Sequence, residues 1–115
     1  MSLPDHILTG YKVLDFTHVL AGPSATRLMV EMGAEVIKVE FPPVGDVSRG
    51  LPMIKNGRSG YFIQQNRGKK SICVDAKSDE GRQIIDSLIA QVDVVIENFA
   101  PGAAARLGIG WDRVK

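Results

Sequence analysis

The chain has 115 residues, 44% hydrophobic and 23% charged, so its composition predicts one folded domain with a packed core and excludes a disordered chain. Its formal net charge is +1, so any attraction to phosphate groups must come from local clusters of basic side chains. The single cysteine, Cys73, excludes an internal disulfide and favours the reducing cytoplasm. No apolar stretch approaches ~20 residues, so we expect neither a signal peptide nor a membrane span.

The first part of the chain predicts a strand, a helix and a second strand. Residues 12–16 (KVLDF) are short, mostly apolar and rich in β-forming side chains, as in a buried strand. Pro23 suits the first position of a helix, and apolar residues at helical spacing continue that helix over 24–32 until Gly33 ends it. Residues 35–40 (EVIKVE) predict the second strand and complete a strand–helix–strand unit.

Residues 41–60 predict a long irregular loop because they contain three prolines and four glycines. Long loops of this kind are often functional or mobile. We expect Asp46 and Arg49 to form an ion pair that orders the loop, although a surface pair contributes only ~0–1 kcal/mol. Residues 61–70 predict one helical turn before a basic stretch.

The second part predicts another strand–helix–strand unit. Residues 71–75 (SICVD) read as a strand, Ser78 suits the cap of a helix whose first turn is acidic, and residues 92–98 (VDVVIEN) read as the fourth strand. A short helix follows over 101–108. Two such units predict an α/β fold with a parallel sheet and flanking helices. Because Trp111 begins a further element, we expect the chain to be the N-terminal piece of a longer protein.

The stretch NRGKKS at residues 66–71 contains the glycine, lysine and serine of a phosphate-binding loop but departs from that motif in three ways. Seven residues instead of four separate Gly60 from Gly68, a second lysine replaces the Ser or Thr that binds magnesium, and the stretch leads into a strand. We therefore expect Lys69 and Lys70 to lie in a solvated turn or to act as peripheral steering charges. A direct contact with a phosphate is the alternative.

Other cofactor motifs are missing from the sequence. The dinucleotide fingerprint G-x-G-x-x-G is absent because only Gly22 follows the first strand, so we expect no NAD or FAD site. No Cys/His cluster predicts zinc, and the carboxylates form no obvious metal set, so we expect no metal.

In an open parallel sheet, ligands favour the loops beyond the carboxyl ends of the strands. The candidate segments by this criterion are 18–21, the residues after Glu40, 75–77 and 98–100. His18 is a candidate for acid–base chemistry or stacking, and the alternative is a hydrogen-bonded structural role. We expect Asp15, inside the first strand, to be satisfied internally.

Four segments in series carry more information than any single motif. They are VLDFTHVLAGPSATRLMVEMGAEVIKVE, GDVSRG, NRGKKSICVDAKSDEGRQII and VDVVIENFAPGAAARLGIGW. In this order, and across nearly the whole chain, they resemble the opening of the family III CoA-transferases, also called the CaiB/BaiF family. This family includes formyl-CoA and carnitine-CoA transferases and, as relatives, α-methylacyl-CoA racemases.

The resemblance implies that residues 1–115 form the N-terminal part of a larger Rossmann-like, CoA-binding domain and that two subunits interlock in a homodimer. The implied ligands are coenzyme A or an acyl-CoA, used as substrate, and a small carboxylic acid, with no nucleic acid, membrane or metal. The catalytic residues of the family lie beyond Lys115, so we assign none here and expect the isolated chain to be inactive. We also expect it to self-associate through open sheet edges and uncovered apolar faces.

The resemblance leaves two reactions open. In the transferases an aspartate attacks the thioester, and enzyme-bound anhydride and thioester intermediates follow. In the racemases a His/Asp pair moves the proton α to the thioester carbonyl. A non-catalytic CoA-binding or dimerisation fragment is a third alternative, whereas a nucleic-acid module would need a broader basic face. Transfer of CoA between an acyl-CoA and a carboxylic acid is the leading expectation.

The resemblance also implies which residues contact CoA, segment by matching segment. They are His18, Val19, Leu20, Ala21, Val74, Asp75, Ala76, Lys77, Asn98, Phe99, Ala100 and Arg106. Several relatives have an arginine where this chain has Phe41, which weakens the expected phosphate binding there unless Arg49 or one of the two lysines compensates. At ~3.3 Å per residue the ends of the third strand lie about 13 Å apart, so Lys77 is a better candidate for a CoA contact than Lys69 or Lys70.

Overall fold

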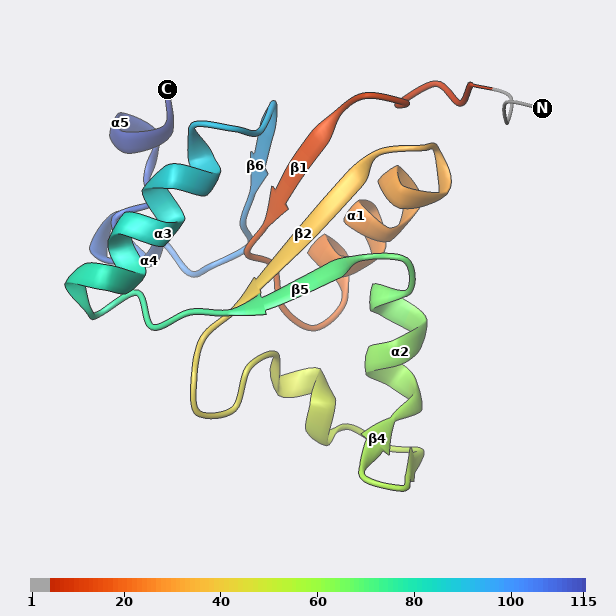
Figure 1. The fold of residues 1–115 in the computed structure, drawn as a ribbon. Helices are drawn as coiled ribbons and strands as arrows, with labels where there is room; N and C mark the ends of the chain where they lie inside the picture. Colours follow the sequence, from red (N-terminus) through yellow and green to blue (C-terminus); the bar gives the residue numbers. More distant parts are fainter. Residues whose placement is uncertain (1–4) are drawn as a thin grey trace.

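The computed structural model describes residues 5–115 and has a four-stranded sheet at its centre (Figure 1). The strands are β1 (Lys12–Asp15), β2 (Glu35–Glu40), β5 (Lys70–Cys73) and β6 (Val94–Ile96), in the spatial order β5-β2-β1-β6. All three pairings are parallel, and Leu14 of β1 lies opposite Ile37 of β2 and Val95 of β6. The predicted parallel α/β fold is therefore confirmed, and the carboxyl ends of all four strands lie at the same edge.

Helices cover both faces of this sheet (Figure 1). The helices in residues 5–115 are α1 (Ala21–Glu31), α2 (Gly60–Asn66), α3 (Asp79–Ile89), α4 (Ala103–Arg106) and α5 (Trp111–Val114), and α1 and α3 pack on opposite faces of the sheet. Successive side chains of a strand point to opposite faces. On one face, Phe16 and Val39 pack with Ile85 of α3 in a buried cluster. On the other, Val13 and Val36 pack with partly buried side chains of α1.

The segment 41–60, for which the sequence predicts an irregular loop, contains regular structure instead. It forms the 3-10 helix η1 (Val47–Gly50) and a hairpin of β3 (Ile54–Lys55) and β4 (Arg58–Ser59). The hairpin closes because Asn56 and Gly57 adopt φ angles of 52° and 72°, and a two-residue turn between antiparallel strands needs such positive values. The single turn predicted after residue 60 is the longer helix α2, which the Ser59 hydroxyl caps by accepting the Phe62 N–H.

The other boundaries differ from the predictions by a few residues. Helix α1 begins at Ala21, so Pro23 is its third residue, where a missing N–H costs no intrahelical bond. A Cβ on Gly22 would lie 2.3 Å from Thr17, so only glycine lets the first turn pack this closely on the end of β1. Gly33 follows α1 with a φ of 101°, as predicted for a helix end. Within residues 5–115, no helix has the length and apolar character needed to cross a membrane.

Candidate functional site

The segments that follow the four strands meet at the carboxyl edge of the sheet (Figure 1). Because β1 and β2 are the central strands, the segments after them are flanked by those that follow β5 and β6. The candidate segments that are far apart in the sequence are thus neighbours in the fold, as the topology rule predicts.

The loop after β1 is held by side chains from elsewhere in the chain. The Thr17 N–H donates to Asp15 Oδ1 (2.8 Å), and the Thr17 carbonyl accepts from Lys38 Nζ (2.7 Å). The His18 N–H donates to Asn98 Oδ1 (2.9 Å), and Asn98 Nδ2 donates back to the His18 carbonyl (3.0 Å). The backbone of this loop is therefore fixed by its partners before any ligand binds.

A buried ion pair lies beneath the same loop. Lys38 Nζ is 2.9 Å from Asp46 Oδ2, and the two side chains are 1% and 0% exposed. Asp46 Oδ1 accepts the N–H groups of Val19 (3.2 Å) and Ser48 (2.9 Å). Burial raises the pKa of Asp46, but hydrogen bonds from Ser48 and Lys38 outweigh this effect and lower the pKa to about 2.

The predicted ion pair between Asp46 and Arg49 is wrong, because Arg49 binds Glu40 instead. Arg49 Nε and Nη2 donate to the two carboxylate oxygens of Glu40, at 2.8 and 2.6 Å. Alternation along β2 puts Lys38 and Glu40 on the same face, so each takes one partner from the segment that crosses it. Burial raises the pKa of Glu40, and the hydrogen bonds from Arg49, the Asp46 N–H and Ser71 lower it to about 2.

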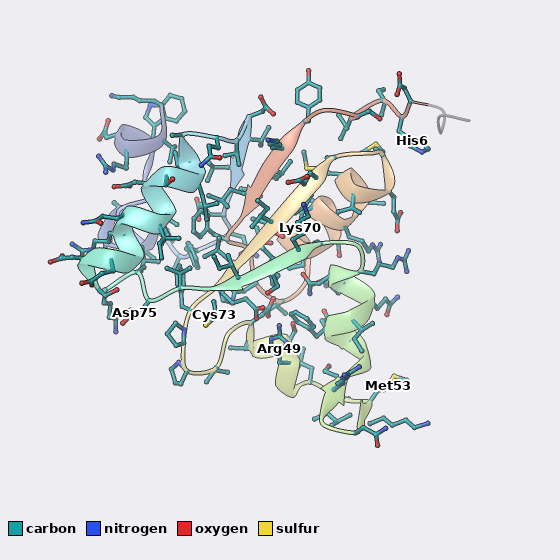
Figure 2. The ribbon with its side chains drawn as sticks, in the orientation of Figure 1. His6, Arg49, Met53, Lys70, Cys73 and Asp75 are labelled. Atoms are coloured by element: carbon teal, nitrogen blue, oxygen red, sulfur yellow. The ribbon has the colours of Figure 1, made fainter. Side chains whose placement is uncertain are left out.

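The two adjacent lysines of the basic stretch have opposite surroundings. Lys69 Nζ lies 2.9 Å from Asp15 Oδ2 and also donates to the Asn66 side chain (2.8 Å), and the Lys69 side chain is only 1% exposed. A solvated position is therefore wrong for Lys69, whereas the internal satisfaction predicted for Asp15 is confirmed. Lys70, at the start of β5 (Figure 2), is exposed and lies 3.2 Å from Glu35.

Aromatic rings form a row along the carboxyl edge. Ring centroids lie 6.2 Å apart for Phe16 and Phe41, 6.3 Å for Phe41 and Phe99, and 5.6 Å for Phe99 and His18. His18 Nε2 is buried and has no hydrogen-bond partner among the described residues. Burial lowers the pKa of His18 and the nearby Asp46 carboxylate opposes this only in part, so the imidazole is neutral at pH 7.

A cavity of about 420 Å³ lies between the segments that follow β2 and β5. Its lining residues are Phe41, Pro42, Pro43, Asp75, Ala76, Lys77 and Leu107. Asp75, between the end of β5 and α3 (Figure 2), accepts the Lys77 N–H at Oδ1 (2.9 Å) and the Ser78 hydroxyl at its carbonyl (2.9 Å). The Asp75 carboxylate therefore shapes the turn, and the Lys77 ammonium makes no ion pair with any residue in 5–115.

Arg106 lines a second cavity, of about 350 Å³, together with Arg82, Asp86 and Arg113. Arg113 binds the Asp86 carboxylate with two hydrogen bonds. No ion pair engages Arg106 in the described part of the chain. Leu107 borders both cavities, so Arg106 lies next to the cavity of Lys77 and not inside it.

The residues expected to contact CoA differ in what they can offer a ligand. Val74 is buried in the core, and Ala76 is also buried except where it lines the cavity. Val19, Leu20, Ala21 and Ala100 are exposed at the edge. Sequence reasoning missed the buried pair of Lys38 and Asp46 under the loop, although a lysine between the valines and isoleucine of β2 was a signal for it. Among residues 5–115, no three His, Cys, Asp or Glu side chains gather as a metal site.

Comparison with known proteins gives a consistent result. The profile of CoA-transferase family III matches residues 8–115. The chain is 46% identical over 109 residues to the formyl-CoA:oxalate CoA-transferase of Afipia carboxidovorans, and 49% identical over 109 residues to the protein of the same name from Streptomyces coelicolor. Both alignments cover 94% of this chain and 26% of the relative, so the chain spans about a quarter of the length of these relatives.

Two solved structures share the fold described above. A hypothetical protein of Mycobacterium tuberculosis, Rv3272, has a TM-score of 0.87 and 43% identity over 97% of this chain and 31% of its own. A CaiB/BaiF family protein of Brucella suis has a TM-score of 0.87 and 38% identity over 96% of this chain and 30% of its own.

Proposed function

The chain belongs to CoA-transferase family III, and we propose that it forms the CoA-binding part of an enzyme that transfers CoA between an acyl-CoA and a free carboxylic acid. The observation that supports this proposal is the cavity at the carboxyl edge of the sheet, whose wall contains Lys77, a lysine that pairs with no acidic residue in 5–115. Its volume of about 420 Å³ fits a small-molecule site, for which ~300–1,000 Å³ is usual.

The chemistry of the cavity suits the nucleotide end of CoA. Phe41, Pro42 and Pro43 offer an apolar wall against which an adenine ring can pack. The Lys77 ammonium is free to meet a phosphate as a point charge, and the Arg106 guanidinium in the neighbouring cavity can bind two phosphate oxygens at once. The exposed segment 19–21 would then lie along the part of CoA that leads to the thiol.

Formyl-CoA and oxalate are the first substrates to test, because the curated relatives are named formyl-CoA:oxalate CoA-transferase. The reaction would convert formyl-CoA and oxalate into oxalyl-CoA and formate. We propose no catalytic residue within this chain. We also propose that the functional unit is a homodimer and that it works in the cytoplasm, a location that the single cysteine of the chain favours.

Two measurements on the intact protein test the proposal. Oxalyl-CoA formation from formyl-CoA and oxalate, followed by chromatography, tests the reaction. If the intact protein transfers CoA between no pair of acyl-CoA and carboxylic acid, the transferase assignment is overturned. Calorimetry with CoA and with 3′-dephospho-CoA tests the site. We expect Lys77→Met to weaken CoA binding about tenfold through one lost charge-assisted contact. Lys55→Met, on the exposed β3–β4 hairpin, should leave the affinity unchanged.

A further inference from the structure

Val19 has a backbone conformation that its side chain disfavours. Its φ angle is 67°, in the left-handed region that β-branched residues rarely adopt. Such outliers persist only where the surrounding structure holds them, and they gather at functional sites. Something in this fold must therefore fix Val19.

Two side chains form hydrogen bonds with the loop backbone, one at this strained position and one at the residue before it. Asp46 accepts the Val19 N–H itself and is locked in place by its buried pairing with Lys38. Asn98 binds both the N–H and the carbonyl of the preceding residue, His18. Strand pairing brings Asn98 there, because Ile96 of β6 lies opposite Asp15 of β1 and both chains leave the sheet together.

The two hydrogen bonds between Asn98 and the His18 backbone, here called the clamp, use half of the hydrogen-bonding capacity of the Asn98 amide. An asparagine amide can accept two hydrogen bonds and donate two, and one of each already goes to the His18 backbone. A direct polar contact with CoA, which the family resemblance implies for Asn98, would have to use the remaining N–H or lone pair without turning the amide away from His18. Glu97, its neighbour, accepts the Phe99 N–H and so leaves the clamp untouched.

We propose that Asn98 is a positioning residue, which acts through the His18 backbone to keep Val19 left-handed and so presets residues 18–20 for the ligand. This inference rests on the proposed function, because CoA is the ligand that the loop would meet. It differs from a contact role in one measurable respect: loss of the Asn98 amide should loosen the loop even when no ligand is present.

The test compares Asn98→Leu, which keeps the size of the side chain without its amide, with the wild type in the intact protein. The matched control is Gln91→Leu, since Gln91, just beyond the end of α3, donates its amide to Ser87 within that helix. Amide hydrogen exchange without ligand is measured at His18 and at Val19. Exchange at Val19 is the decisive readout, because its own acceptor, Asp46, is unchanged. Calorimetry with CoA and the melting temperature complete the set.

We expect Asn98→Leu to speed exchange at both amides and to weaken CoA binding, each about tenfold, with an unchanged melting temperature. Weaker CoA binding with unchanged exchange at Val19 would identify a direct contact and overturn the proposal. Faster exchange with unchanged CoA affinity would also overturn the proposal, because CoA binding would then not depend on the order of the loop. No change in exchange or in affinity would overturn it as well.

If the wild type fails to bind CoA, the proposed function fails, and exchange at Val19 still decides whether Asn98 positions the loop. If Asn98→Leu lowers the melting temperature, Asn98→Asp replaces it, because the carboxylate keeps the acceptor for the His18 N–H and loses only the donor. Exchange at Val19 that matches the wild type in this variant and in Asn98→Leu would refute the clamp.

Discussion

Replacing Lys69 by methionine should destabilise the fold far more than the same change at Lys70. The Lys69 ammonium is buried against the Asp15 carboxylate, and both side chains are at most 1% exposed. Removing one partner of such a pair leaves a buried charge and typically costs ~3–5 kcal/mol. Asp15 keeps its hydrogen bonds from the hydroxyls of Thr17 and Thr26, so we expect the low end of that range, about 3 kcal/mol.

The Lys70→Met variant is the matched control because it alters the neighbouring residue in the same way. Lys70 is 68% exposed and pairs with Glu35 at the surface, so its loss should cost ~0–1 kcal/mol. Equilibrium urea unfolding of both variants measures the difference. With a slope of about 1.5 kcal/mol per molar urea, the midpoint should fall by about 2 M for Lys69→Met and by less than about 0.7 M for Lys70→Met. Equal shifts, or a larger one for Lys70→Met, would refute the buried pairing.

Three further outcomes follow from the structure. The pKa values of Glu40 and Asp46 are lowered to about 2 in the folded state, so the unfolded state binds more protons as the pH falls. The free energy of unfolding should therefore drop by about 2–3 kcal/mol per group between about pH 5 and pH 2. A urea midpoint that stays constant over that pH range would contradict both lowered pKa values. Gly81→Ala would place a Cβ 1.9 Å from the Asp75 carbonyl oxygen and should lower the free energy of unfolding by at least about 2 kcal/mol. Gly50→Ala is the control, because its Cβ would have no neighbour within 4 Å, and its stability should be within about 0.5 kcal/mol of the wild type. Similar melting temperatures for the two variants would count against the close approach of α3 to the Asp75 carbonyl. The isolated 115-residue chain should self-associate with concentration in light scattering, because apolar side chains such as Met53 are exposed, and a monodisperse monomer would contradict this expectation.

The sequence was sufficient for the strands and the main helices because their signals are local. Alternation and apolar spacing determine β2 and α1, and a serine before an acidic turn determines the start of α3. The hairpin in 41–60 also has a local signal, an Asn-Gly pair, which the abundance of proline and glycine in that segment obscured.

The candidate site was predictable only as a set of segments. Nothing local distinguishes Lys69 from Lys70, because burial of one and exposure of the other depend on Asp15, which is more than fifty residues away in the chain. The partners of Lys38 and Glu40 likewise depend on how the segment after β2 folds back over the sheet. Contacts between such distant residues follow from the topology, which the sequence pattern gives only in outline.

A crystal structure of the intact protein with bound CoA tests the central claim most directly. We expect the adenosine part of CoA in the cavity between Phe41 and Lys77, with the rest of the molecule running along residues 18–21 at the carboxyl edge of the sheet. CoA bound at the amino ends of the strands, or on the β3–β4 hairpin with this cavity empty, would contradict the proposed site.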